Sequence, residues 1–195
     1  MPMRTYTLHL ASTSPRRRQL LEQLNLSFEI QKADVDEAPY SGEHPAECVL
    51  RLARTKAEVA ARCLGQPDAR VLAADTTVGL EGLLLGKPKD RDDGLAMLEQ
   101  LSGRTHQVFS AVALWYNGRM NVALSTSEVT FRDIRTSEAA AYWDTGEPVD
   151  KAGGYGIQGL GAVFIARLQG SYSGVVGLPL YETVELLRGA GISVF

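Results

Sequence analysis

The sequence predicts an α/β fold, with a mixed, twisted sheet flanked by helices. Three observations lead to this prediction. Strand-like apolar runs alternate with helical patterns, two long strand-like segments flank an Asn-Gly turn signal, and no linker, repeat or low-complexity stretch divides the 195 residues. Alternating strands and helices are typical of sheets covered by helices, and the Asn-Gly signal adds an antiparallel hairpin. With 45% hydrophobic residues, the chain is long enough to bury a core, as one domain or as two small lobes.

The first element is predicted in the stretch Leu8–Arg18, which reads LHLASTSPRRR. Its apolar start is typical of a strand that ends in a turn. The hydroxyl residues Ser12–Ser14 are of the types that cap helices, and proline suits the first helical position. We therefore expect a helix over Pro15–Leu24.

Three arginines, Arg16, Arg17 and Arg18, follow in the first turn of this helix. The amino end of a helix carries a partial positive charge, so each cation there costs about 0.3–1 kcal/mol unless it is screened. Free backbone N–H groups, hydroxyls and a guanidinium together form a phosphate site, and a bound anion would remove this cost. Successive helical residues point about 100° apart, so we expect Arg16 and Arg17 to face the site and Arg18 to face solvent. A solvated arginine run on a surface helix is the alternative.

The next segments predict a strand, a helix and a second strand. Phe28–Lys32 predicts a strand that leads into an acidic loop at 33–37. Pro45–Leu64 predicts a long helix because its apolar residues recur at helical spacing, and Gly65 ends it. Arg70–Thr76 predicts a strand that is covered on both faces, because its central residues form a continuous apolar run.

The second half of the chain predicts the central hairpins and the remaining helices. Val78–Leu85, broken by Gly82, predicts a further hairpin. Gln107–Tyr116 and Met120–Phe131 predict two long strands joined at Asn117-Gly118, a dipeptide that favours a two-residue hairpin turn. The other predicted elements are a helix over Asp92–Leu101, a helix over Ser137–Thr145 that Ser137 caps, a glycine-dense segment over Asp150–Gly161, a strand over Val163–Leu168 and a helix over Pro179–Arg188.

Charge and composition argue against several classes of function. A formal net charge of −3 disfavours nonspecific binding to nucleic acid, which needs a basic face. No apolar run approaches the length of a membrane span and no signal peptide opens the chain, so we expect a cytoplasmic protein without a membrane partner. Cys48 and Cys63 fall in one predicted helix, too far apart to bond, and the three histidines form no metal-ligand spacing.

Asp75 is the first candidate for chemistry. It follows four apolar residues, so we expect it at the end of a buried strand, where α/β sheets place their ligands. A carboxylate is expensive to bury there without a cation or hydrogen-bond donors. In a functional interpretation, Asp75 is a metal ligand or a base that activates water. In a structural interpretation, it caps the following turn. The hydroxyls of Thr76 and Thr77 at the same place favour function.

The acidic loop offers a second pair of carboxylates, Asp36 and Glu37. Together with Asp75 and substrate phosphate oxygens they could hold Mg²⁺, which proteins usually bind through one or two carboxylates and phosphate. A solvated acidic loop is the alternative.

Two lysines are candidate phosphate cations besides the arginines. Lys87 lies between Gly86 and Pro88, in a turn whose restricted backbone limits the freedom lost on binding. Lys56 lies at the edge of the apolar stripe of its helix, where it could instead extend its ammonium group to water.

The segment Lys151–Gly161 places five glycines within nine residues. Glycine lets the backbone approach a flat ligand closely. The amide of Gln158 inside this segment offers one donor and one acceptor group, which suits the edge of a nucleobase. A flexible loop without a ligand is the alternative. The segment matches neither the dinucleotide-binding glycine fingerprint nor a Walker A sequence.

With these residues in view, the chain resembles the Maf family of nucleoside triphosphate pyrophosphatases, also called septum-formation-inhibitor-like proteins. The matching pieces span nearly the whole chain in family order. They are LASTSPRR (10–17), VDE (35–37), RLARTKA (51–57), AADTTV (73–78), GKP (86–88), LSGRTHQV (101–108), VTFR (129–132), GEPVDKAGGYGIQGLG (146–161) and VVGLPLYET (175–183). Within the family the chain resembles the dTTP/UTP-cleaving branch, which has Arg, Thr and Gln at the positions of Arg16, Thr76 and Gln158.

The resemblance implies an elongated fold with a central cleft, formed by a single domain, 1–195, with two lobes around that cleft. It also implies a homodimer and a divalent cation, Mg²⁺ or Mn²⁺, with Asp75 as the proton acceptor. The expected site residues fall into three groups. They are the catalytic residues Asp75, Glu37, Lys56 and Lys87, the substrate-binding residues Ser12, Ser14, Arg16, Arg17, Thr76 and Gln158, and the metal ligands Asp75 and Glu37.

We therefore expect an enzyme that hydrolyses the α–β phosphoanhydride of dTTP and UTP to the monophosphate and pyrophosphate, with CTP and modified uridine triphosphates as further candidates. Asp75 and the metal would activate water, and positive groups would neutralise the triphosphate. Gln158 would read the uracil or thymine edge. The alternative is a nonenzymatic nucleotide-binding regulator of cell division, which would bind the same ligand without releasing pyrophosphate.

Overall fold

The computed structural model describes residues 7–66 and 68–195. Their strands are β1 (Leu8–Leu10), β2 (Phe28–Ile30), β3 (Arg70–Leu80), β4 (Leu83–Leu85), β5 (Thr105–Tyr116), β6 (Arg119–Phe131) and β7 (Ile165–Gln169). The helices are α1 (Pro15–Glu22), α2 (Pro45–Leu64), α3 (Arg91–Leu101), α4 (Thr136–Asp144), α5 (Tyr172–Val176) and α6 (Leu180–Gly189), with three 3₁₀ turns, η1 (Glu147–Asp150), η2 (Ala152–Gly154) and η3 (Leu160–Phe164). None of the described helices is long and apolar enough to cross a membrane.

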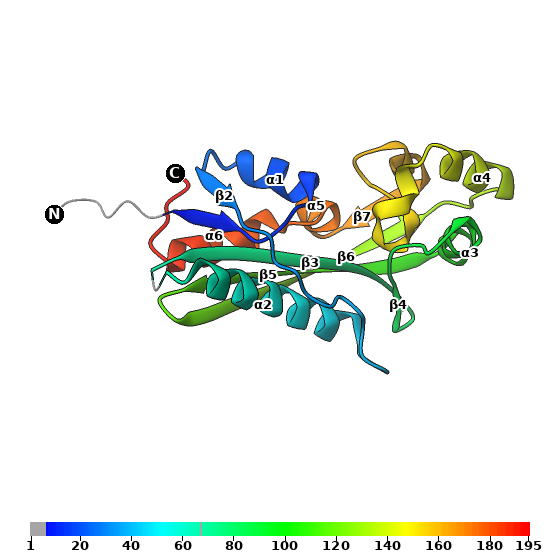
Figure 1. Cartoon of the computed structure of the whole chain (residues 1–195). Coiled ribbons are helices and arrows are strands. Elements are labelled where there is room, and N and C mark those ends of the chain that lie inside the picture. The colour runs from blue at the N-terminus through cyan, green and yellow to red at the C-terminus, as the bar shows by residue number, and fades with distance from the viewer. Residues whose placement is uncertain (1–6, 67) are drawn as a thin grey trace.

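The strands form one mixed sheet in the order β2-β1-β3-β5-β6-β7, with β4 also paired to β3. β1 runs parallel to β2 and β3, whereas β3, β5, β6 and β7 pair antiparallel. Figure 1 shows β3, β5 and β6 running along the length of an elongated molecule, with α2 on one face and α1, α5 and α6 on the other. The predicted α/β class and its mixed, helix-flanked sheet are confirmed.

The alternation of side chains along β3 divides the core between the two faces. Val71 and Ala73 pack with the alanine-rich stripe of α2, whereas Leu72 and Ala74 pack with the core formed by α1, α5 and α6. Successive strand residues point to opposite faces, so a run that is apolar throughout must be covered on both sides. This is the arrangement that the sequence predicted for this strand.

One edge of β3 is interrupted. β5 covers its other edge from Val71 to Gly79, so β1 and β4 share the remaining edge. β1 pairs with residues 70–72 and β4 with residues 78–80, which leaves Ala73–Thr77 without a neighbouring strand there among the described residues. Successive side chains of this opening lie on opposite faces of the sheet, and Asp75, Thr76 and Thr77 line a cleft there.

The prediction that Asp75 lies at the end of a strand is wrong. β3 continues to Leu80 because β5 pairs with it along nearly its whole length. The chain turns only at Glu81 and Gly82, which both adopt positive φ angles, and β4 is three residues long. Asp75 nevertheless lies beyond the part of β3 that pairs with β1, which ends at Leu72.

Other differences are small. The helix predicted from Ser137 begins at Thr136 with Arg135 as its N-cap, because Glu138 accepts a hydrogen bond from the backbone of Arg135. The glycine-dense segment forms η1, η2 and η3, and the short helix α5 was not predicted. The Asn117-Gly118 turn is confirmed, since both residues have the positive φ that a type I′ hairpin turn requires.

Two helical glycines provide a test of the packing. Alanine ordinarily favours a helix over glycine by about 1 kcal/mol, but a Cβ on Gly94 of α3 would lie 2.1 Å from Cζ3 of Trp143. A Cβ on Gly189 of α6 would meet nothing within 4 Å. We expect Gly94→Ala to lower the melting temperature by several degrees and Gly189→Ala to leave it unchanged or raise it, as measured by circular dichroism. Equal melting temperatures for the two variants would contradict this contact.

Candidate active site

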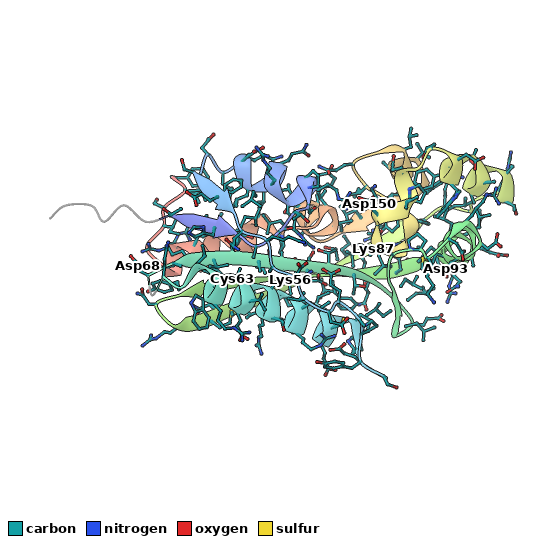
Figure 2. All side chains as sticks on the ribbon, in the orientation of Figure 1. Lys56, Cys63, Asp68, Lys87, Asp93 and Asp150 are labelled. Atoms are coloured by element: carbon teal, nitrogen blue, oxygen red, sulfur yellow. The ribbon has the colours of Figure 1, made fainter. Side chains whose placement is uncertain are left out.

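A cleft of about 1110 Å³ opens at the interrupted edge of β3. Its lining includes all ten residues that the sequence analysis singled out for the site, which are Ser12, Ser14, Arg16, Arg17, Glu37, Lys56, Asp75, Thr76, Lys87 and Gln158. Figure 2 places Lys56, Lys87 and Asp150 near the middle of the molecule, away from Asp68 and Asp93 towards its ends. The structure thus brings residues from distant parts of the chain to one place.

The turn before α1 forms one wall of the cleft. Ser14 is the N-cap of α1, and its Oγ accepts a hydrogen bond of 3.5 Å from the backbone N–H of Arg17. Ser12 Oγ accepts another, of 3.2 Å, from the N–H of Ser14. Both hydroxyls therefore stabilise the turn that leads into α1. The amino end of α1 faces the cleft.

Of the three arginines of α1, Arg16 and Arg17 line the cleft and Arg18 points away from it, as the helix geometry predicts. Arg17 donates from Nε to the carbonyl of Gly177, at 2.8 Å, and from Nη2 to Thr76 Oγ1, at 3.4 Å. Burial lowers the pKa of the Arg17 guanidinium, and the carboxylates of Asp75 and Glu37 oppose that shift. Arg18 is exposed and pairs with Glu22 of its own helix.

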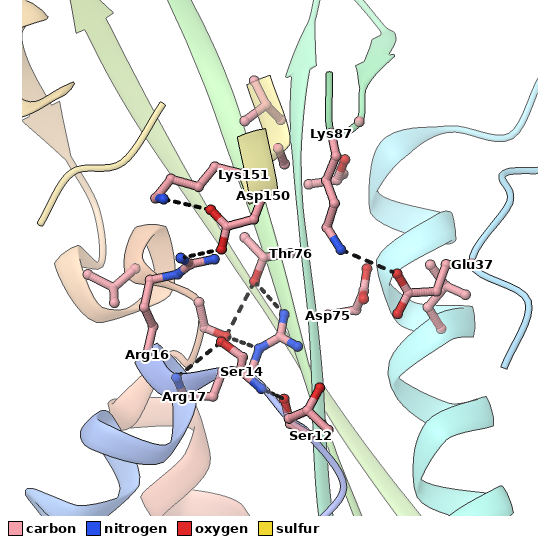
Figure 3. A pocket seen from close by; sticks show the side chains of 18 of the residues that line it. Ser12, Ser14, Arg16, Arg17, Glu37, Asp75, Thr76, Lys87, Asp150 and Lys151 are labelled. Atoms are coloured by element: carbon pink, nitrogen blue, oxygen red, sulfur yellow. Dashed lines mark hydrogen bonds and ion pairs between the residues drawn. The ribbon is translucent and has the colours of Figure 1, made fainter. Parts of the chain in front are cut away.

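The opposite wall carries a cation between two carboxylates. Lys56 Nζ lies 2.6 Å from Asp75 Oδ1 and 2.6 Å from Glu37 Oε1, and Lys87 Nζ lies 3.9 Å from Glu37 Oε2. Lys56 and Asp75 are only 6% and 8% exposed. The alternative that Lys56 extends to water is therefore wrong. Figure 3 shows Glu37, Asp75 and Lys87 on one side of β3, and Arg16 and Arg17 on the other.

The charge state of Glu37 follows from its neighbours. Burial raises its pKa, but the hydrogen bond and charge of Lys56, with smaller contributions from Lys87 and Arg17, hold the pKa below its ordinary value. Glu37 is therefore ionised at neutral pH. Two carboxylates on one side of an anion-binding cleft suit a hard divalent cation, which takes oxygen ligands and keeps positions for phosphate.

The predicted set of three carboxylates is not assembled. Asp36 Oδ1 instead accepts a hydrogen bond from the backbone N–H of Ala38, at 2.9 Å. Among the described residues no group of three or more His, Cys, Asp or Glu is placed to hold a metal ion. Asp75 and Glu37 remain the pair that fits one, with substrate oxygens completing the ligands.

The loop that carries Glu37 is fixed by an ion pair that the sequence analysis missed. Arg51 of α2 binds Glu43 through two contacts of 2.6 Å, donates to the carbonyl of Ala38, and stacks over the ring of Tyr40 with Cζ 4.0 Å from its centroid. The Arg51 hydrogen bond lowers the pKa of Glu43 to about 2. These contacts join a loop to a helix, so no local sequence signal identifies them.

Asp150 links α1 to the segment that follows η1. Its Oδ2 lies 3.1 Å from Arg16 Nη1, and its Oδ1 lies 2.7 Å from Lys151 Nζ. Figure 3 shows Asp150 between these two cations. Arg16 therefore faces the cleft from α1 while it is held by a residue of η1.

The segment around Gln158 is tied at both ends. Glu147 accepts hydrogen bonds from the hydroxyl of Tyr142, at 2.7 Å, and from the backbone N–H groups of Leu160 and Gly161, at 2.8 and 3.1 Å. The Tyr142 hydroxyl in turn accepts from the N–H of Gly156, at 3.1 Å. Gln158 is exposed between these anchors. Glu147 and Tyr142 were not predicted as site residues, because only the fold brings them beneath the segment.

The fold and the cleft define a class of α/β protein that has guanidinium groups on one wall of the cleft and a lysine held between two carboxylates on the other. The chain belongs to the family of Maf-like proteins, whose family model matches residues 7–190.

Two relatives match nearly the whole chain. The dTTP/UTP pyrophosphatase of Saccharophagus degradans is 51% identical over 190 residues, which cover 96% of this chain and 90% of the relative. The dTTP/UTP pyrophosphatase of Methylobacillus flagellatus is 49% identical over 187 residues, which cover 96% of this chain and 94% of the relative. The solved Ham1 protein of Staphylococcus aureus is 17% identical, with a TM-score of 0.47, over 64% of this chain and 71% of that one.

Removal of the Lys56 ammonium tests the buried ion pair. Lys56→Met leaves the Asp75 carboxylate buried without its closest cation, and breaking such a pair from one side costs about 3–5 kcal/mol. We expect urea unfolding to show this loss, and we expect the double variant Lys56→Met with Asp75→Asn to recover part of it. A Lys56→Met variant as stable as the wild type would contradict the pairing.

Proposed function

We propose that the chain is a nucleoside triphosphate pyrophosphatase that cleaves the α–β phosphoanhydride of dTTP and UTP, releasing the monophosphate and pyrophosphate. The observation that carries this proposal is the single cleft in which Asp75 and Glu37, bridged by Lys56, lie among Arg16, Arg17 and Lys87. The activity for which the two relatives are named, dTTP/UTP pyrophosphatase, supports the choice of reaction and substrates.

Asp75 is the proposed general base. Its Oδ1 is held by Lys56, so its second oxygen accepts the proton of the water molecule that attacks the α-phosphorus. Pyrophosphate leaves as the bond between the α-phosphorus and the bridging oxygen breaks. The Lys56 ammonium, 2.6 Å from Oδ1, fixes the orientation of the carboxylate.

Charge neutralisation comes from both walls of the cleft. Arg17, Lys56 and Lys87 surround the place where the triphosphate would lie, and Ser12, Ser14 and the amino end of α1 add hydrogen-bond donors. Fixed charges in a partly enclosed site stabilise the charge that develops on the phosphate oxygens.

Asp75 and Glu37 are the residues that would hold Mg²⁺ or Mn²⁺. When bound, the ion would neutralise phosphate charge next to the scissile bond. The fit rests on two carboxylates of which Glu37 is ionised at neutral pH, together with room in the cleft for substrate oxygens.

The nucleobase would be recognised in the part of the cleft that Gln158 lines. The amide N–H of Gln158 would donate to the O4 carbonyl of uracil or thymine, and Arg16 and Thr76 line the cleft with it. We propose in addition that residues 1–195 form a single domain with two lobes around this cleft, and that the enzyme acts in the cytoplasm as a homodimer that binds no nucleic acid.

Asp75→Asn tests the reaction. With UTP or dTTP and Mg²⁺, we expect the wild type to release pyrophosphate and the variant to lose at least about a hundredfold in kcat while its nucleotide Kd changes little. Glu37 remains as a counter-ion for Lys56, so the variant should fold. Asp68→Asn, at an exposed position far from the cleft, is the control.

Two results would contradict the proposal. Full turnover by Asp75→Asn would remove Asp75 from the reaction. Nucleotide binding by the wild type without pyrophosphate release would favour the nonenzymatic regulator instead.

A further inference from the structure

Thr76 and Ser110 form a hydrogen-bonded pair at the bottom of the cleft, on the face of the sheet opposite Asp75. Thr76 Oγ1 lies 2.5 Å from Ser110 Oγ, and Ser110 Oγ lies 2.7 Å from the carbonyl oxygen of Gly174 in α5. Ser110 is 1% exposed, whereas Thr76 is half-buried and lines the cleft. The pair therefore connects a buried strand residue to a surface that a ligand can touch.

The direction of the protons follows from these contacts. A carbonyl oxygen only accepts, so at 2.7 Å the Ser110 proton must point to Gly174. Ser110 then has only lone pairs to offer, and Thr76 must donate across the 2.5 Å contact. The carbonyl of Gly177 is a poorer acceptor for Thr76, at 3.4 Å.

Two further contacts agree with this assignment. Gly174 lies in the five-residue helix α5, and the last carbonyls of a helix need partners from outside it. Arg17 Nη2 lies 3.4 Å from Thr76 Oγ1 and can only donate, so it also treats the threonine oxygen as an acceptor. The Thr76 hydroxyl thus presents lone pairs, and no proton, to the cleft.

We infer that Ser110 is a specificity-determining positioning residue, which fixes Thr76 as a hydrogen-bond acceptor and thereby selects uracil and thymine over cytosine. This inference rests on the proposed function. The N3 atom of uracil and thymine carries a proton that Thr76 accepts. The N3 atom of cytosine carries a lone pair instead, which would face the lone pairs of Thr76 and leave both groups unpaired.

Ser110→Ala is the variant that tests this inference. It removes the acceptor of the Thr76 proton, so the hydroxyl can turn and donate to a ligand. We expect the preference for uridine over cytidine to fall about tenfold, the size of one net hydrogen bond. The measurement is the calorimetric Kd of the nonhydrolysable α,β-imido analogues of UTP and CTP. A purely structural role would weaken both analogues equally and leave the ratio of their Kd values unchanged.

Two further variants make the test specific. Ser125→Ala is the matched control, because Ser125 pairs with Ser110 across β5 and β6, is also buried, and also lies near Gly174. It should leave the ratio unchanged. In a Thr76→Val background, Ser110→Ala should have no further effect on the ratio, because it acts through the threonine hydroxyl.

The outcomes separate this inference from the proposed function. A ratio unchanged by Ser110→Ala, or changed equally by Ser125→Ala, would overturn it. So would a wild type that binds the two analogues equally. Pyrophosphate release is measured separately, with UTP, so a chain that discriminates the analogues without cleaving UTP would refute only the proposed reaction.

Discussion

The Lys56 ammonium is the group on which the arrangement of the cleft depends. A cation buried to this degree is tolerated only when opposite charges lie close to it. Two other segments meet that requirement for the lysine of α2, because β3 supplies Asp75 and the loop before α2 supplies Glu37. A buried pair of this kind adds little to overall stability compared with apolar packing, so we interpret it as a device that fixes where the helix, the strand and the loop stand relative to one another.

The interrupted edge of β3 explains why this charged group can exist beside an alanine-rich core. On either side of the opening, β1 and β4 satisfy the backbone of β3 and close the sheet. Within the opening, the polar residues Asp75, Thr76 and Thr77 line the cleft. The parallel strand β1 ends there and passes directly into α1, so the amino end of a helix is directed at the same opening.

The sequence predicts the parts of the site that depend on local patterns. Ser14 and Pro15 identify the start of α1, and a carboxylate after an apolar run identifies Asp75 as unusual. The partners of these groups could not be derived in the same way. Arg51 and Glu43, or Glu147 and the N–H groups of 160–161, meet only because loops and helices pack together. The extension of β3 beyond Asp75 was missed for the same reason, since it depends on pairing with β5 and not on its own residues.

The alternation of side chains along β3 also places two groups of cleft residues on opposite faces of the sheet. Asp75 and Thr76 are adjacent, yet they point to opposite faces of the sheet. Asp75 lies with Lys56 and Glu37 on the side of α2, and Thr76 lies with Ser110 and Arg17 on the side of α5. The two groups share no hydrogen bond across β3 among the described contacts, so under the proposed function a change at Ser110 or Thr76 alters nucleobase binding without moving Asp75. The strand itself keeps the two groups at a fixed separation, so under the proposed function Asp75 acts from the α2 side while Thr76 and Arg17 contact the same nucleotide from the α5 side.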